Sequence, residues 1–215
     1  MVRVFKVTQL NNIDAWGLLQ EMRDHSQTVA DVDWASDNKI VTSSHDRSVI
    51  VWRQAGNKWE KMLVNIDIKL SILVSKWAPS TKKFALGSSC NTLALGFYNV
   101  VAKCWTVSTR SSLAKAPITT LCFHPSSNML VMGSADFAVK VVAASFKKSK
   151  DEFIQQSKVE DYPYNGPFAN VDSLFEVLLS IDNLGGWVNH VSFENNGASL
   201  LIIPHSNHIK VLEIG

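Results

Sequence analysis

The stretch TSSHDRSVIVW, Thr42 to Trp52, decides the fold because it sets an aspartate in a polar turn and a tryptophan six residues later. Serine and aspartate favour a tight turn, and the residues between Asp46 and Trp52 have the pattern of a β-strand. The same frame recurs at Asn91 in CNTLALGF and at Asp136 in ADFAVKVV, because positions 46, 91 and 136 are 45 residues apart. The chain is therefore predicted to repeat one small β unit.

Composition restricts the class of protein. The chain has 215 residues, 46% of them hydrophobic and 19% charged, with a net charge of +2. These values predict a packed globular domain and give no sign of binding to nucleic acid or to a membrane surface. The cysteines lack CxxC spacing, which argues against a disulfide framework and a zinc cage and favours a reducing compartment; they are Cys90, Cys104 and Cys122. Without a secretory signal or a long apolar run, a cytoplasmic protein is expected.

Each repeat unit contains short strand-like segments separated by polar turns. A period of about 40–45 residues with this content is typical of the blades of a β-propeller, each of which needs its neighbours to bury its faces. The expected strands lie at 28–35, 39–45, 48–54, 59–65, 71–79, 83–89, 92–99, 101–108, 118–125, 129–135, 138–145, 174–181, 188–195, 199–206 and 208–215. Residues 1–215 are thus predicted to form one all-β propeller domain, with a long insert at 145–174.

Alignment of the units predicts which positions are equivalent. An aromatic ring ends the first strand of each unit and is expected to fill the space between neighbouring blades, at Trp34, Trp77, Phe123 and Phe193. The turn position is expected at Asp46, Asn91, Asp136 and Ser206, and the position six residues later at Trp52, Phe97, Val142 and Leu212. On this alignment the first unit is the one that keeps a full polar set.

That polar set resembles the WD repeat; its members are His25, Thr42, Ser44, Asp46 and Trp52. In the WD-repeat family a His, a Ser or Thr, an Asp and a Trp form a hydrogen-bonded chain across the blade, and buried polar groups of this kind need partners. The resemblance implies that Asp46 accepts hydrogen bonds from His25 and from backbone amides of its turn. Asp46 is then a scaffold residue and not a catalytic acid.

More specific motifs resemble the WD-repeat subunit of the actin-related-protein complex that nucleates branched actin filaments. They are WAPSTKKFALGSS at 77–89, ADF at 135–137, GPF at 166–168 and GGWV at 185–188. The resemblance implies a non-enzymatic scaffold subunit of the cytoplasm and actin cytoskeleton, with actin-related proteins, sister subunits and the actin filament as partners. It implies no cofactor, metal, small-molecule substrate, nucleic acid or membrane. The alternative is a WD-repeat adaptor of another assembly, such as a ubiquitin ligase or a trafficking coat.

Enzymatic and metal sites are less favoured by the sequence than this interpretation. The chain has Ser, His and Asp residues but no GxSxG nucleophile elbow, so a hydrolase is disfavoured. His205 and His208 have a spacing that could suit a metal, yet no cysteine or carboxylate lies beside them, and a solvated turn is favoured. The segments LGSS and MGSA are strand ends without the GxxxxGK of a phosphate loop.

The insert is the expected partner-binding segment. It carries four aromatic residues among prolines and polar residues: Phe153, Tyr162, Tyr164 and Phe168. Long loops inside compact domains are often functional, and exposed aromatic residues are common anchors at interfaces. The alternative, that Phe168 and Tyr164 fold back on the blade rim, is equally favoured.

The strand count predicts an incomplete ring. The segments VRVFKV and WGLLQEM supply two outer strands of a first blade, the next three blades have all their strands, and the last has three, ending at HIKVLEIG. The resemblance therefore covers about four blades of the seven-bladed ring of the family. An open arc is expected, with strand edges and apolar blade faces exposed at both ends.

Overall fold

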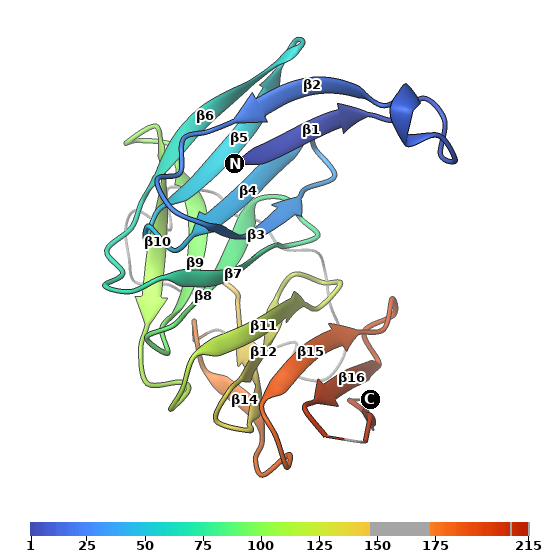
Figure 1. Cartoon of the computed structure of the whole chain (residues 1–215). Helices are drawn as coiled ribbons and strands as arrows, with labels where there is room; N and C mark the ends of the chain where they lie inside the picture. Colours follow the sequence, from blue (N-terminus) through green and yellow to red (C-terminus); the bar gives the residue numbers. More distant parts are fainter. Residues whose placement is uncertain (147–172, 207, 215) are drawn as a thin grey trace.

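The structure is a computed structural model that describes residues 1–146, 173–206 and 208–214. These residues are almost entirely β-strand and turn, as the sequence predicts (Figure 1). The strands are β1 (Val2–Lys6), β2 (Gly17–Met22), β3 (Val29–Trp34), β4 (Lys39–Ser44), β5 (Val49–Ala55), β6 (Lys58–Asn65), β7 (Ile72–Trp77), β8 (Lys83–Ser88), β9 (Leu93–Asn99), β10 (Cys104–Arg110), β11 (Ile118–Phe123), β12 (Met129–Ser134), β13 (Val139–Ala143), β14 (Val177–Ile181), β15 (Val188–Phe193), β16 (Ser199–Pro204) and β17 (Lys210–Glu213). A 3₁₀ turn, η1 (Ile13–Ala15), joins β1 to β2.

The strands form antiparallel groups in chain order, which we call sheets I to V. Sheet I is β1–β2, sheet II is β3–β6, sheet III is β7–β10, sheet IV is β11–β14 and sheet V is β15–β17. Within the described ranges these groups contain two, four, four, four and three strands, with II and III joined into one eight-stranded sheet. Figure 1 shows sheet I at the top of the molecule and sheet V at the bottom, so the two ends of the chain are well separated.

Hydrophobic cores lie between successive sheets, because the two central strands of each inner sheet are largely buried on both faces. One strand residue points into the core before its sheet and the next points into the core after it. In β4, Ile40 packs toward sheet I, whereas Val41 packs toward sheet III. The buried central strands of sheets III and IV consequently read as continuous apolar runs without polar alternation.

One paired position recurs in sheets II to V, and in sheets II, III and IV it faces the sheet that follows. The pairs, one residue from each of the two central strands, are Val41–Val51, Ala85–Leu95, Val131–Val141 and Leu201–Val211. The first three pairs are almost completely buried, each against the next sheet along the chain. In sheet V the same position is open, and Val211 is 65% exposed.

In sheets III, IV and V, the aromatic residue that ends the first strand lies on the other side of the core from the aliphatic pair of the preceding sheet. Trp77, Phe123 and Phe193 are buried and lie in the cores that contain the pair of the preceding sheet. Trp34 departs from the expectation that this ring fills the space between blades, because its side chain is 55% exposed. Sheet I consists of β1 and β2, and the ring of Trp34 packs in a T-shaped arrangement with Trp59, with ring centroids 5.3 Å apart.

An unexpected pairing joins the outer strands of sheets II and III. β6 and β10 run parallel, with Val64 opposite Trp105 and Asn65 opposite Thr106. Their inner strands β3 and β7 are held by side chains, since Asp31 and Asp33 of β3 accept hydrogen bonds from backbone amides of β7. Sheets II and III thus enclose their core on two sides.

No helix among the described residues is long and apolar enough to cross a membrane.

Candidate functional site

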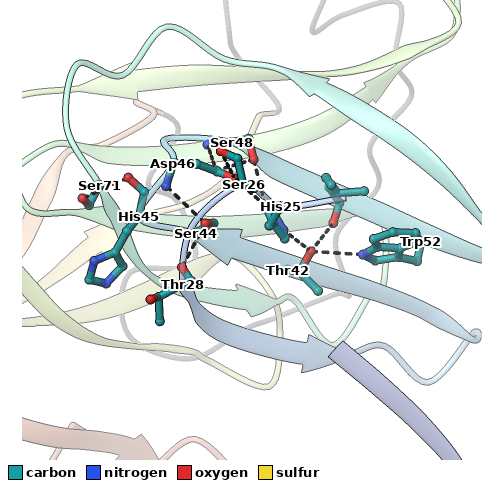
Figure 2. A network of polar contacts seen from close by, with 11 residues as sticks. His25, Ser26, Thr28, Thr42, Ser44, His45, Asp46, Ser48, Trp52 and Ser71 are labelled. Carbon is teal, nitrogen blue, oxygen red and sulfur yellow. Dashed lines mark hydrogen bonds and ion pairs between the residues drawn. The ribbon is translucent and has the colours of Figure 1, made fainter. Parts of the chain in front are cut away.

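The five polar residues singled out in the first repeat meet in one network (Figure 2). His25 precedes β3, Thr42 lies on β4, Asp46 is in the turn after β4, and Trp52 lies on β5. His25 Nε2 is 2.8 Å from Thr42 Oγ1, and the indole Nε1 of Trp52 donates to the same hydroxyl at 3.0 Å. On its other side, His25 Nδ1 lies 3.3 Å from Asp46 Oδ2 and 2.8 Å from Ser48 Oγ.

The partners assign the protons of the network. Since a carboxylate can only accept, His25 Nδ1 is the donor toward Asp46, and Nε2 of the neutral ring accepts from the Thr42 hydroxyl. The Trp52 indole can only donate, so it takes a lone pair of Thr42 Oγ1. The hydrogen bonds therefore run in one direction, from Trp52 on β5 through Thr42 on β4 to His25 before β3 and Asp46 in the turn after β4.

Asp46 fixes the turn and ties it to the chain before β3. Its carboxylate accepts from the backbone N–H of Ser26 at 2.7 Å, and from the N–H and hydroxyl of Ser48 at 2.9 and 2.5 Å. Ser44 donates from its hydroxyl to the Thr28 carbonyl and accepts from the Asp46 N–H. The side chains of Asp46 and Ser44 thus tie the turn after β4 to the segment that precedes β3.

The environment shifts the pKa values of both charged partners downward. Burial alone would raise the pKa of Asp46, but the hydrogen bonds from Ser48 and Ser26 and the neighbouring His25 together lower it far below its usual value. Burial lowers the pKa of His25 from its ordinary value near 6.5, and Asp46 opposes this shift only in part. A neutral histidine beside an ionised aspartate is the resulting state.

This chemistry is that of a scaffold. The side chains of His25 and Asp46 are 3% and 8% exposed, and their polar atoms point at other members of the network. A general base must reach a proton on a bound substrate, and a nucleophile must be open to it. Neither condition holds at this network.

The second repeat corrects the sequence alignment by one position. Residues with positive φ follow the turn aspartate, as Arg47 follows Asp46 and Phe137 follows Asp136, and in the second repeat the residue with positive φ is Asn91. Cys90, and not Asn91, therefore occupies the aspartate position. Its thiol lies 3.1 Å from Ser88 Oγ, the counterpart of Ser44, and 3.5 Å from Thr92 Oγ1, the counterpart of Ser48.

The Cys90 thiol lies among polar groups, in contacts with the Ser88 and Thr92 hydroxyls in which either atom can donate. Burial would raise the pKa of Cys90, but hydrogen bonds involving Ser88 and Thr92 and the backbone of Leu70 lower it below its ordinary value. The polar neighbours of Cys90 thus occupy the positions that Ser44 and Ser48 occupy around Asp46.

The same one-residue shift moves the tryptophan position of the second repeat from Phe97 to Gly96. Gly96 lies opposite Phe84 in the sheet, as Trp52 lies opposite Ile40. A Cβ atom on Gly96 would come within 2.2 Å of the Phe84 ring. Phe84 fills the space that Trp52 fills in sheet II.

The third and fourth repeats keep parts of the set. Asp136 accepts from the backbone N–H groups of Lys115 and Ala138, so it fixes its turn without a histidine. Val142 lies opposite Leu130, and Leu212 lies opposite Leu200. This is the strand register in which Trp52 lies opposite Ile40. In sheets IV and V, apolar side chains thus occupy the position of Trp52.

The histidine pair of the fourth repeat has no metal-site geometry around it. The His205 ring packs edge-on against Trp187, with centroids 5.2 Å apart, and its Nδ1 lies 3.5 Å from Asn189 Nδ2. Across residues 1–146, 173–206 and 208–214, no group of three or more His, Cys, Asp or Glu residues converges on a point that could hold a metal ion.

The insert aromatics Phe153, Tyr162, Tyr164 and Phe168 lie outside the described residues. The two ends of the insert are described and are anchored in the core. Phe146 is buried against Phe97, with ring centroids 5.3 Å apart, and Phe175 is buried in the same cluster. The insert therefore begins and ends at the core between sheets III and IV.

Sequence reasoning missed the aspartates that join sheets II and III. Asp31 Oδ2 accepts from the Ser75 N–H at 2.9 Å and Asp33 Oδ2 from the Trp77 N–H at 2.6 Å, while Lys76 lies between the two carboxylates. The available signal was the alternation in DVDW, which puts both carboxylates on one side of the innermost strand.

Comparison with known proteins agrees with this fold. Residues 16–53 and 107–142 match the WD domain, G-beta repeat family. The β-propeller domain of Cps50 (Swd1) from Myceliophteria thermophila has a similar structure, with a TM-score of 0.66 and 13% identity over 95% of this chain and 58% of that chain. The fold is a WD40 β-propeller fold.

Curated relatives match most of the sequence. Actin-related protein 2/3 complex subunit 1A-B of Xenopus laevis is 26% identical over 94% of this chain and 53% of its own length. Subunit 1A of Arabidopsis thaliana is 29% identical over 91% and 50%, and subunit 1 of Schizosaccharomyces pombe is 25% identical over 92% and 50%. The chain thus spans about half the length of these relatives. The resemblance expected from the sequence motifs is confirmed.

Proposed function

We propose that this chain, which carries WD40 repeats and is homologous to subunit 1 of the actin-related protein 2/3 complex, acts as a scaffold subunit of such a complex. The observation that carries the proposal is the similarity of more than nine-tenths of the chain to relatives bearing that one name. In this role the protein binds actin-related proteins and sister subunits and supports nucleation of branched actin filaments. It acts in the cytoplasm, at the actin cytoskeleton.

The proposed role is positional and not enzymatic. The polar groups of the His25–Asp46 network are paired with one another and hold sheet II together, which supports a role that depends on shape and surface. We propose that the five groups of strands are portions of blades, about four blades' worth, in the arc of a seven-bladed ring. No cofactor is required for this role.

We further propose that the insert contributes to partner binding through Phe153, Tyr162, Tyr164 and Phe168. The support is its position: Phe146 and Phe175 hold its two ends on the core between sheets III and IV. An insert fixed at both ends can present aromatic side chains to a partner without disturbing the propeller.

Affinity purification followed by mass spectrometry tests the complex. The tagged 215-residue chain, expressed in cells of its own source, should recover both actin-related proteins and the sister subunits in near-equal amounts. Recovery of ubiquitin-ligase or vesicle-coat components instead would support the adaptor alternative. Recovery of neither actin-related protein nor any sister subunit would contradict the proposal.

A further inference from the structure

The turns after the first strands of sheets II to V are tied to one another in chain order. These turns are residues 35–38, 78–82, 124–128 and 194–198. The Thr81 hydroxyl donates to the Asp37 carboxylate and joins the second turn to the first. The Ser80 N–H donates to the Ser127 hydroxyl and joins the second turn to the third.

The third and fourth turns, which belong to sheets IV and V, meet through His124. This residue is 2% exposed, and its ring packs edge-on against Phe193 with ring centroids 5.1 Å apart. A Cβ atom on Gly197 would overlap Nε2 of the ring. The imidazole therefore fills the space beside the backbone of the fourth turn.

The size of His124 is matched by the residue that it meets. Each turn has one residue with positive φ; in chain order they are Asn38, Thr81, Ser127 and Gly197. In sheets II and III the residue after the aromatic ring is alanine, and the next turn carries a side chain at its positive-φ position, Thr81 or Ser127. In sheet IV the residue after the ring is His124, and the next turn has glycine. His124 and Gly197 thus form a complementary pair.

The contacts of the ring determine its protonation state. The Ser126 N–H donates to His124 Nδ1 at 3.1 Å, so the neutral ring carries its proton on Nε2, the nitrogen that faces Gly197. The Ser126 hydroxyl lies 2.7 Å from the same Nδ1. A second ring proton must therefore go to Nδ1, where it takes from the Ser126 N–H its acceptor at a buried position.

The surroundings of the ring favour its neutral form. Burial lowers the pKa of His124, and a hydrogen bond with the Gly197 backbone opposes this shift only in part. The side chains that meet the ring from β15 and from its own turn, Phe193 and Ser126, carry no charge. The charged residue of the facing turn is Glu194, whose carboxylate accepts from the Ser199 hydroxyl.

We propose that protonation of His124 releases the turn at 194–198 from the turn at 124–128, so that the contact between sheets IV and V loosens in acid. The release is local, because the shared hydrophobic core and the bond from the Thr119 hydroxyl to the Val188 carbonyl still hold β11 and β15 together. When the turns separate, water reaches the ring and its pKa returns toward the ordinary value near 6.5. The open form thus binds a proton more readily than the closed form, and acidification favours it.

Amide hydrogen exchange, followed by NMR in the purified 215-residue chain, tests this joint. Protection factors, which are corrected for the intrinsic effect of pH on exchange, are compared at pH 7.5 and pH 5.5 for the amides of Ser126 and Gly197. Since the open form gains its proton near pH 6.5, both factors should fall by up to about tenfold. At pH 5.5 both amides should be less protected than those of β8, because the opening is local.

Two variants without the titrating ring assign the effect to His124. His124→Ala combined with Gly197→Ser gives this joint the alanine and serine that Ala78 and Ser127 supply between sheets III and IV. If circular dichroism shows that the double variant does not fold, His124→Asn replaces it, because the amide oxygen can accept from the Ser126 N–H and does not titrate. In either variant the protection of the amide at position 197 should change by less than about twofold between the two pH values.

The matched control is His190→Gln, which removes an exposed histidine from β15 of the same sheet V. This variant should keep the fall in protection. The proposal is overturned if protection at position 197 is unchanged by pH in the unmodified chain, or if it falls equally without His124. Loss of the effect in the His190 variant, or protection at position 197 equal to that of β8, would also overturn it. No measurement here involves actin-related proteins, so the outcome is independent of the proposed function.

Discussion

At the scale of single residues, Asp46 is the most connected side chain of the repeat that introduced the fold. It accepts hydrogen bonds from Ser26, from Ser48 and from His25. Replacement by alanine removes the acceptor and leaves buried donors without a partner, which costs about 1–3 kcal/mol of unfolding free energy. Asp46→Ala should therefore lower the midpoint of thermal or urea unfolding, measured by circular dichroism.

Asp136→Ala is the matched control for that change. Asp136 occupies the same turn position but accepts from two backbone amides and has no histidine partner. Its loss should cost less than the loss of Asp46. Equal stability of the Asp46 variant and the unmodified chain would contradict the scaffold role.

Two buried histidines make stability depend on pH. Burial lowers the pKa of His25 and of His124 below the ordinary value near 6.5, so the unfolded chain binds protons more readily than the folded one. With the unfolded state holding more protons, stability falls as pH decreases through 6.5 toward the lowered pKa values.

The measurement is the unfolding midpoint between about pH 7.5 and pH 5.5, the range in which free histidine titrates. It should drop on acidification, and the drop should shrink in a His25→Gln, His124→Gln double variant. An identical drop in the double variant would assign the pH dependence to other groups.

The five network residues could be named from sequence because the first repeat resembles the WD repeat, in which a His, a Ser or Thr, an Asp and a Trp form a hydrogen-bonded chain. Cys90 could not. Asparagine resembles aspartate chemically and also tolerates positive φ. Asn91 therefore fits the aspartate position of the sequence pattern, but its backbone places it one position after that site. A fixed step of 45 residues does not detect a unit that is one residue shorter.

At the scale of strands, β8 and β9 show how one sheet replaces the tryptophan of another. Gly96 lacks a side chain where Phe84 approaches from the neighbouring strand. Gly96→Ala should destabilise the protein by about 1–3 kcal/mol, since the added methyl overlaps the ring. The loss is measurable by urea unfolding.

Phe84→Leu, alone and combined with Gly96→Ala, tests whether the two positions share one space. It removes the ring atoms that the methyl meets, so the double variant should be more stable than the sum of the two single losses predicts. Additive losses would mean that the two side chains do not share one space.

The insert yields a prediction about partners. Tyr162→Ala combined with Tyr164→Ala should reduce recovery of sister subunits severalfold while leaving the unfolding midpoint within about 1 °C, as expected when exposed anchor residues of an interface are removed. Parallel loss of recovery and of stability would favour the alternative that these rings pack on the propeller rim.

At the scale of the whole molecule, sheets II and III behave as one body because their outer strands pair. Sequence pattern located β6 and β10 within a few residues, but nothing in the pattern of either strand indicates which edge it will meet. That pairing depends on how two separately specified sheets are inclined to each other. Tertiary geometry, and not local propensity, decides it.

Hydrogen exchange should reveal the pairing. β10 has a neighbour on both sides, β9 and β6, whereas β14 is the last strand of its sheet within the described residues. Peptides that cover Cys104–Arg110 should exchange more slowly than peptides that cover Val177–Ile181, as measured by mass spectrometry. The reverse order would argue against the β6–β10 contact in solution.

The β6–β10 pairing determines the order in which the sheets separate under mechanical load. To pull sheet II from sheet III, a force must break the β6–β10 ladder together with the bonds that Asp31 and Asp33 make to β7. Between sheets III and IV, the hydrogen bonds among the described residues are isolated ones. Examples are the bond from the Ser80 N–H to the Ser127 hydroxyl and the bond from Lys83 Nζ to the Ala144 carbonyl. In a stretched molecule, sheet IV should therefore separate from sheet III before sheet III separates from sheet II.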